Sequence, residues 1–329
     1  MKNPSRLPAI SAALGMLLLI LDSKTALHAA QDGAVLCLRT VVPALFPFFV
    51  LSTLLTCSVR TETAGWLRPL ESATGIPRGA GSILLAGHLG GYPIGAKCIG
   101  EACQQGRISR QDAARMMAFC NNAGPAFIFG IAGPMFPEKW AGLALWAIQI
   151  LSSLTVGAIL PGKSSEGFRN AKTDPITATD AVNRAGKAMA AVCSWVLLFR
   201  VILAILDRWL LWILPAEVSI TVSGLLELTN GCCSLGMIRD QGSRFIVCAG
   251  ILAFGGLCVG MQTTSVASGV SLKWYLPGKL LQTALAVSMA LAVTEAPHAL
   301  LMIAVMIPLL IFCSEKAKNR CRISRRIGV

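Results

Sequence analysis

Apolar runs of about 17 residues or more recur from one end of the chain to the other, and they constrain its fold more than any other feature. A helix needs about 20 such residues to cross the hydrocarbon core of a bilayer, whereas buried strands are about 4–8 residues long. Only 14% of the 329 residues are charged, against about 25% in soluble domains. The sequence therefore predicts an all-α, polytopic membrane protein rather than a soluble α/β protein.

The runs predict about eight transmembrane helices. For the first run, Asp22 and Lys24 resemble an interface and favour a retained helix, although a cleaved signal peptide ending near Ala26–Ala30 is the alternative. Pro43 and Pro47 are expected to kink the second helix. The predicted helices cover residues 7–28, 38–57, 110–136, 140–160, 188–214, 244–270, 275–294 and 297–313.

Two shorter apolar stretches, 80–103 and 218–237, are cut by helix-breaking residues. Every backbone polar group in hydrocarbon must be paired internally, so such breaks are tolerated only inside protein or beside a wet cavity. We predict that each stretch is a re-entrant hairpin of two half-length helices. In the first, the expected turn residues are Gly90, Gly91, Pro93 and Gly95.

The helix that follows each hairpin is itself interrupted. FCNNAGP (Phe119–Pro125) breaks the first at Gly124 and Pro125, and FGGLCVGMQTTS (Phe254–Ser265) breaks the second at Gly255 and Gly256. Because both halves show the same order of elements, we predict an internal repeat. The expected divisions are a first transmembrane helix (1–33), repeat 1 (34–161), a cytoplasmic linker (162–187), repeat 2 (188–294), and a last transmembrane helix with a basic cytoplasmic tail (295–329).

The distribution of Lys and Arg predicts the orientation. With a cytoplasmic N-terminus, eight spans and two hairpins that return to their own side, 21 basic residues lie inside and 6 outside. Cytoplasmic loops carry such an excess. Both termini are then cytoplasmic, and the hairpins enter from opposite sides, which makes the repeats inverted, as in secondary transporters.

The net charge of +13 fits this topology and contact with anionic membrane lipids, so we do not expect a nucleic-acid partner. HExxH and GxSxG motifs, carboxylate clusters and zinc-type cysteine spacings are absent from the sequence. We therefore expect no enzyme activity, catalytic residue, metal ligand or cofactor. The twelve cysteines are expected to be small packing residues.

Polar residues at the breaks are the candidate binding residues. Glu227 is the strongest candidate among them. A carboxylate within an apolar segment is unfavourable in free energy unless it pairs, binds a ligand or takes a proton. Its alternative roles are an interfacial position or a pair with Arg200. The amides could instead join helices to one another, and Lys97 could snorkel or act as a counter-charge. The full set is Tyr92, Asn121, Asn122, Glu227, Thr229, Asn230, Gln262 and Thr263.

The sequences GGYPIGAK (Gly90–Lys97), FCNNAGP, LLELTNG (Leu225–Gly231) and FGGLCVGMQ resemble the sporulation integral membrane protein YlbJ type. That type is similar to a wider group with a nucleoside-recognition (Gate) domain, which includes nucleoside transporters and the gates of ferrous-iron transporters. The resemblance implies inverted repeats of a hairpin and a broken helix. It also implies that seven of the candidate residues contact the ligand: Tyr92, Asn121, Asn122, Glu227, Thr229, Asn230 and Gln262.

Together these features favour a secondary transporter or permease in the cytoplasmic (inner) membrane that moves a small polar solute by alternating access. Coupling to H⁺ or Na⁺ is expected, with Glu227 as the coupling carboxylate. The resemblance adds a role in sporulation. The alternative is a membrane scaffold or signalling component for spore formation that transports nothing. The substrate, and whether the protein is a homo-oligomer, stay open.

Overall fold

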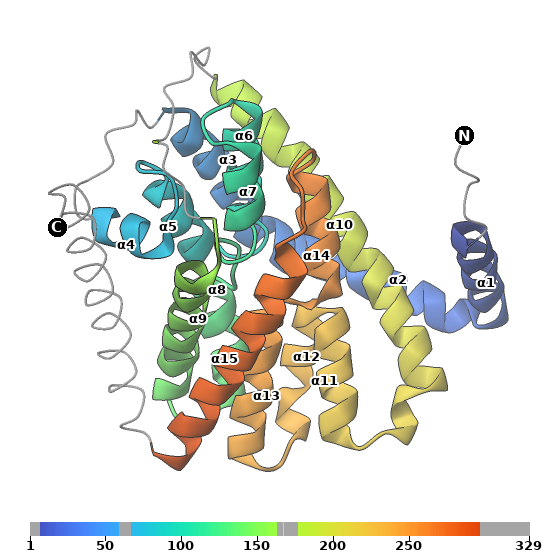
Figure 1. Ribbon diagram of the computed structural model, residues 1–329. Helices are drawn as coiled ribbons and strands as arrows, with labels where there is room; N and C mark the ends of the chain where they lie inside the picture. The colour runs from blue at the N-terminus through green and yellow to red at the C-terminus, as the bar shows by residue number, and fades with distance from the viewer. Residues whose placement is uncertain (1–6, 59–66, 163–166, 168–176, 297–329) are drawn as a thin grey trace, which may run out of the picture.

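The computed structural model describes residues 7–58, 67–162, 167 and 177–296 (Figure 1). Within these ranges the chain is helical, with one isolated bridge between Arg78 and Gly167. The predicted all-α class is therefore confirmed. The predicted last span, the basic tail and most of the linker lie outside the described residues.

The N-terminal region differs from the expected pair of spans at 7–28 and 38–57. Helix α1 (Leu7–Leu21) and the helix that follows meet at Asp22 with a bend of 101°. The second helix comprises α2 (Ser23–Leu36), a π-helical turn (Cys37–Val41) and α3 (Val42–Ser58). It begins earlier than expected because the small, buried face of α2 (Ala26, Ala29 and Gly33) packs against α10.

The first predicted hairpin is present. We call it hairpin 1; it consists of α5 (Gly81–Leu89) and α6 (Ile94–Gln104), which turn at Gly90–Pro93. A short helix, α4 (Arg68–Thr74), precedes it. Helix α7 (Arg110–Met116) follows and begins at a cap in which the Ser109 hydroxyl accepts a hydrogen bond from the backbone N–H of Asp112.

The first interrupted helix is more broken than expected. After α7 the chain turns and runs without regular structure through Asn121–Gly124. It resumes as α8 (Pro125–Phe127) with a π-helical turn (Ile128–Ala132) and a 3₁₀ turn (Gly133–Met135). Pro125 lacks a backbone N–H and so begins the new helix. Helix α9 (Trp140–Ile159) then runs back along it.

The second half begins with α10 (Ala178–Trp209), which starts in the predicted linker at a capping box of Thr177 and Asp180. A 3₁₀ turn (Leu211–Ile213) leads to the second predicted hairpin, hairpin 2, formed by α11 (Ala216–Leu226) and α12 (Leu228–Ser234). After a 3₁₀ turn (Leu235–Met237) come the two parts of the broken helix, α13 (Gln241–Phe254) and α14 (Gly256–Val266), and then α15 (Tyr275–Glu295).

Four helices in the described ranges are long and apolar enough to cross a membrane: α9, α10, the α13–α14 pair and α15. The bent α1–α2 pair would make a fifth. The predicted total of eight is not confirmed, because 110–136 consists of short pieces and 297–313 lies outside the described residues.

The two hairpins lie toward opposite ends of the helical bundle (Figure 1). Hairpin 1 contacts α14 through α6, and hairpin 2 contacts the π-helical turn at Ile128–Ala132 through α12. Each hairpin therefore packs against the second part of the broken helix from the other half. This crossed arrangement is the one that inverted repeats would produce, and the repeat itself stays a prediction.

Candidate functional site

The tip of hairpin 1 carries Tyr92 into the interior. The Tyr92–Pro93 peptide bond is cis, and the Tyr92 side chain is buried. Its hydroxyl donates a hydrogen bond to the carbonyl of Leu252 on α13 at 3.2 Å. A residue of the first half therefore contacts the second broken helix directly.

Close packing against the first interrupted segment requires glycine in both arms of hairpin 1. A Cβ atom on Gly87 or on Gly95 would overlap the carbonyl oxygen of Cys120. This packing places the hairpin next to Asn121 and Asn122, which are both fully buried. The Asn121 amide accepts from the backbone N–H of Ala96 and donates to the Thr263 hydroxyl at 3.0 Å.

Lys279 on α15 stands in the middle of these groups. Its side chain is fully buried, and its ammonium, with three N–H bonds, lies within hydrogen-bonding distance of four oxygen atoms. These are the Tyr92 hydroxyl at 3.0 Å, the Asn121 carbonyl at 2.6 Å, Asn122 Oδ1 at 3.4 Å and Gln282 Oε1 at 2.9 Å. We call Tyr92, Asn121, Asn122, Lys279 and Gln282 the central polar cluster.

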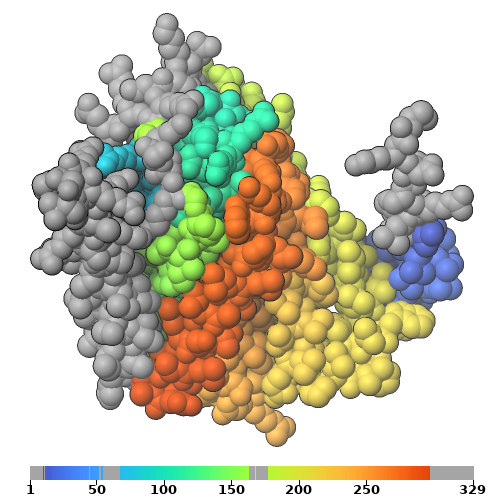
Figure 2. All heavy atoms as spheres, viewed as in Figure 1, coloured from blue at the N-terminus to red at the C-terminus, as the bar shows by residue number. Residues whose placement is uncertain are grey.

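Hydrogen bonds extend the cluster to α5 and α9. The Asn122 amide accepts from Gln282 at 2.9 Å and faces Nε2 of His88 at 3.2 Å. His88 in turn lies 2.6 Å from the hydroxyl of Ser153 on α9. Figure 2 shows the atoms of α15 and α9 forming a continuous surface on this face of the molecule. Lys279, Asn121, Asn122 and Gln282 are fully buried, so the cluster is closed to solvent in the structure.

One buried hydroxyl beside the cluster, that of Tyr275, has no hydrogen-bond partner of normal geometry among the described residues. Tyr275, at the start of α15, lies close to Thr263, but its hydroxyl makes no hydrogen bond within the described residues. A buried polar group without a partner is unfavourable by about 1–3 kcal/mol. The Tyr275 hydroxyl is therefore available to a water molecule or a bound solute.

Glu227 occupies the tip of hairpin 2 as a helix cap. Its two carboxylate oxygens accept the backbone N–H groups of Thr229 at 2.9 Å and Asn230 at 2.7 Å. These are among the first N–H groups of α12, which have no partner within the helix. The burial of the carboxylate is thus explained by its role as the N-terminal cap of a helix that begins in the interior of the protein. It does not pair with Arg200, whose guanidinium donates to Asn230 Oδ1 instead.

The tips of the two hairpins meet at the break in the second long helix. Gly255 and Gly256 both adopt positive φ, at 83° and 84°. A Cβ atom on Gly255 would lie 2.8 Å from the Tyr92 ring, and one on Gly256 would lie 3.1 Å from the backbone nitrogen of Leu228. Hairpin 1 therefore contacts one side of this break and hairpin 2 contacts the other.

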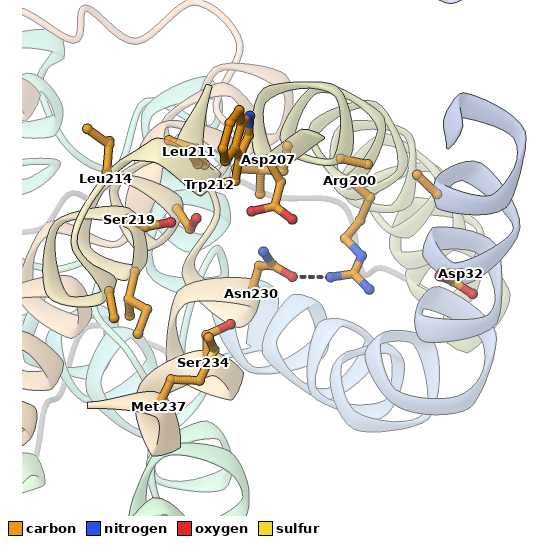
Figure 3. A pocket seen from close by; sticks show the side chains of 16 residues that line it. Asp32, Arg200, Asp207, Leu211, Trp212, Leu214, Ser219, Asn230, Ser234 and Met237 are labelled. Atoms are coloured by element: carbon orange, nitrogen blue, oxygen red, sulfur yellow. Dashed lines mark hydrogen bonds between the residues drawn. The ribbon is translucent and has the colours of Figure 1, made fainter. Parts of the chain in front are cut away.

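A pocket of about 520 Å³ lies beside hairpin 2 (Figure 3). Arg200 and Asn230 face each other across it, and Asp207 lies near them. The pocket extends from Ala216, the first residue of hairpin 2, to Asn230 near the tip of the hairpin. We call it the charged pocket; its polar lining residues are Asp32, Arg200, Asp207, Ser219, Ser223, Asn230 and Ser234.

The predicted binding residues thus form two groups. Tyr92, Asn121, Asn122 and Thr263 come together around Lys279, whereas Glu227, Thr229 and Asn230 belong to the tip of hairpin 2. Gln262 lies next to Thr263 on α14 and donates to the sulfur of Cys258. Lys97 neither snorkels nor reaches Glu227, because it is buried and pairs with Glu101 at 3.0 Å.

Lys279 is the functional candidate that the sequence prediction missed. The topology count placed it with the cytoplasmic cations, at the start of the predicted span 275–294. In the structure these residues lie in the first turn of α15. The available signal was the spacing of Tyr275, Lys279 and Gln282, which puts three polar side chains on one face of an apolar helix.

A P-loop spacing also occurs once, at Gly157–Ser164. A phosphate-binding P-loop needs a strand before the glycine-rich turn and a helix after it. Here Gly157 lies inside α9 and packs on the ring of Phe119. The element before the turn is therefore a helix, which does not fit an ATP site.

No family model matches the chain, and no solved structure matches it. One curated relative is the sporulation integral membrane protein YlbJ of Bacillus subtilis (strain 168). The two are 26% identical over 306 residues, which cover 78% of this chain and 74% of the relative. The similarity bears out the resemblance to this type, whereas the wider nucleoside-recognition grouping stays a prediction. The chain is thus a multi-pass, helical membrane protein that is similar to the sporulation integral membrane protein YlbJ.

Proposed function

We propose that the protein is a secondary transporter or permease that moves a small polar solute across the cytoplasmic membrane by alternating access, in support of spore formation. The observation that carries this proposal is the meeting of both hairpin tips at Gly255–Gly256. Half-helices and unwound backbone near a repeat interface are the usual binding elements of secondary transporters.

The geometry supports a mechanism in which the two hairpins open in turn. Each hairpin is a short pair of helices, and its tip closely approaches a glycine of the break, Gly255 for hairpin 1 and Gly256 for hairpin 2. Moving hairpin 2 away from Gly256 would connect the charged pocket with the break, since this pocket already reaches Asn230. Moving hairpin 1 would expose the central polar cluster from the other end.

The binding groups favour a polar solute. Amide side chains and hydroxyls dominate the central polar cluster, and the hydroxyl of Tyr275 has no partner within the described residues. Such groups recognise hydroxyl, amide and carbonyl groups of a ligand through hydrogen bonds. Coupling to H⁺ or Na⁺ forms part of the proposal.

The test is uptake into proteoliposomes of radiolabelled uridine, alanine and malate, each under an imposed pH gradient and an imposed Na⁺ gradient. The matched variants are Asn122→Ala, in the central polar cluster, and Ser288→Ala, on the exposed face of the same helix that carries Lys279. Uptake that Asn122→Ala lowers and Ser288→Ala leaves unchanged supports transport. Equal uptake by protein-containing and empty liposomes for all three solutes argues against it.

The second candidate is a scaffold or signalling component in spore formation, since the name of the relative describes sporulation and no transport. A deletion strain distinguishes the two functions. Full rescue of sporulation by an Asn122→Ala, Lys279→Met double variant that is present at normal levels would favour the scaffold. Failure of that variant, with rescue by Ser288→Ala, would favour transport.

A further inference from the structure

The surroundings of the Lys279 ammonium resemble those of a bound monovalent cation. Its partners are a backbone carbonyl from an unwound helix segment, two side-chain amide oxygens and a hydroxyl, at 2.6–3.4 Å. All four partners are uncharged oxygen atoms. In secondary transporters, backbone carbonyls of unwound helix segments coordinate the coupling ion, Na⁺ or H⁺. In this protein the cation at that position is the ammonium group of Lys279.

Within the part of the chain that the structure describes, the charge of Lys279 is not neutralised by a contacting carboxylate. The titratable groups that face its amine are His88 on α5, Tyr92 at the tip of hairpin 1 and Cys120 before the break. Helices α9 and α13 contribute uncharged groups here, the Gln149 side chain and the Leu252 carbonyl. Burial opposes the charged form of an amine, and the four oxygen acceptors favour it. The charge state of Lys279 is therefore sensitive to whether water reaches the cluster.

Glu227, the carboxylate expected to carry a coupling proton, is engaged elsewhere. Both of its oxygens accept backbone N–H groups at the start of α12. Protonation would turn one acceptor into a donor that faces an N–H group, so proton release and uptake there would disrupt hairpin 2. A neutral Lys279 amine keeps two N–H bonds for its four acceptors, so it can release a proton and still donate to the Asn121 carbonyl.

We infer that Lys279 is the residue that carries the coupling proton, in the place that a sodium ion would otherwise fill at the helix break. This inference rests on the proposed transport function and names its coupling ion. When the cluster opens to one side, an N–H bond of the ammonium breaks, the electron pair stays on nitrogen, and the proton passes to water. When the cluster opens to the other side, the amine takes a proton from water.

The first experiment measures accumulation of the solutes named above in proteoliposomes, with Lys279→Met and the control Lys273→Met. Lys273 is exposed, six positions earlier in the chain, and lies over the ring of Trp274. A gradient of one pH unit can drive about tenfold accumulation if one proton moves with each solute. We expect this accumulation in wild type and Lys273→Met, with or without replacement of Na⁺ by choline. We expect Lys279→Met to show no pH-driven accumulation.

The second experiment needs no substrate. Acetic anhydride labels neutral amines, and mass spectrometry measures the labelling of Lys279 and Lys273 in native nanodiscs between pH 6 and pH 9. A proton carrier must meet water while the protein is folded, so we expect Lys279 to react more slowly than Lys273 but measurably, at a rate that rises with pH.

The outcomes separate the inference from the proposed function. Accumulation that requires Na⁺, or pH-driven accumulation that survives in Lys279→Met, would overturn the inference while transport stands. Lys279 that stays unlabelled until the protein unfolds, while Lys273 reacts, would overturn it even if none of the solutes were taken up. If Lys279→Met does not fold, the labelling of the wild-type protein still decides.

Discussion

Substitution of Glu227 separates the role predicted from sequence, a coupling carboxylate, from the role seen in the structure, a helix cap. The carboxylate is 3% exposed and accepts two backbone N–H groups. Glu227→Gln keeps one acceptor oxygen and replaces the other by an amide that faces an N–H group. Glu227→Ala removes both acceptors and leaves two buried N–H groups without partners.

The size of each effect follows from these contacts. A hydrogen bond to a charged group contributes about 1.5–3 kcal/mol to stability, so Glu227→Gln should lower the free energy of unfolding by about that amount. Glu227→Ala loses two such bonds and should lower it by about 3 kcal/mol or more. The cost is high because water cannot reach the orphaned N–H groups.

Asp240 provides the matched control, since it caps α13 by accepting the backbone N–H of Ser243 but is exposed. That backbone hydrogen bond, together with one from the Ser243 side chain, lowers the pKa of Asp240, which is therefore ionised at neutral pH. Asparagine caps helices about as well as aspartate, so Asp240→Asn should change stability by no more than about 0.5 kcal/mol.

The assays are denaturant unfolding in micelles and uptake under a pH gradient. We expect stability to fall in the order wild type, Glu227→Gln, Glu227→Ala, with Asp240→Asn close to wild type. The folded fraction of Glu227→Gln should keep its response to the pH gradient. A Glu227→Gln protein as stable as wild type, whose uptake no longer responds to pH, would refute the capping role and restore Glu227 as the coupling residue.

Three further substitutions test the packing around the site. Arg115→Leu should lower the free energy of unfolding by about 1.5–3 kcal/mol or more, because its guanidinium binds carbonyls at the ends of α4 and α9, and the exposed Arg110→Leu should not. Gly95→Ala should displace hairpin 1 and lower stability by about 1–3 kcal/mol in thermal unfolding, whereas Gly130→Ala, which has open space, should not. Tyr92→Phe should lower stability by about 0.5–1.5 kcal/mol and slow uptake, since its hydroxyl accepts from the Lys279 amine.

The sequence was most informative where a local signal decides the backbone. Glycine and proline predicted the turn of hairpin 1 and the break before Pro125, and a glycine pair predicted the break at Gly255–Gly256. The cap at Ser109 was also predictable, because Ser109 and Asp112 have the spacing of a capping box. Each of these features depends on residues within one turn of each other.

Features set by tertiary packing could not be predicted in this way. The bend at Asp22 depends on the docking of Ala26 and Ala29 against α10, which is distant in the sequence. The burial of Lys279 depends on oxygen atoms from hairpin 1 and from the first interrupted helix. Charge counting treats every lysine near a helix end as a loop residue, and so it assigned Lys279 to the cytoplasm.

The most direct test of alternating access is amide hydrogen exchange of the protein in nanodiscs, followed by mass spectrometry. The peptides to compare cover the hairpin tips, 88–97 and 224–234, the break at 119–125, and α9 as a rigid reference. If the two hairpins open in turn, the tips and the break should exchange faster than α9 although they are just as buried. Protection of both tips equal to that of α9 over the whole time course would contradict alternating access at this site.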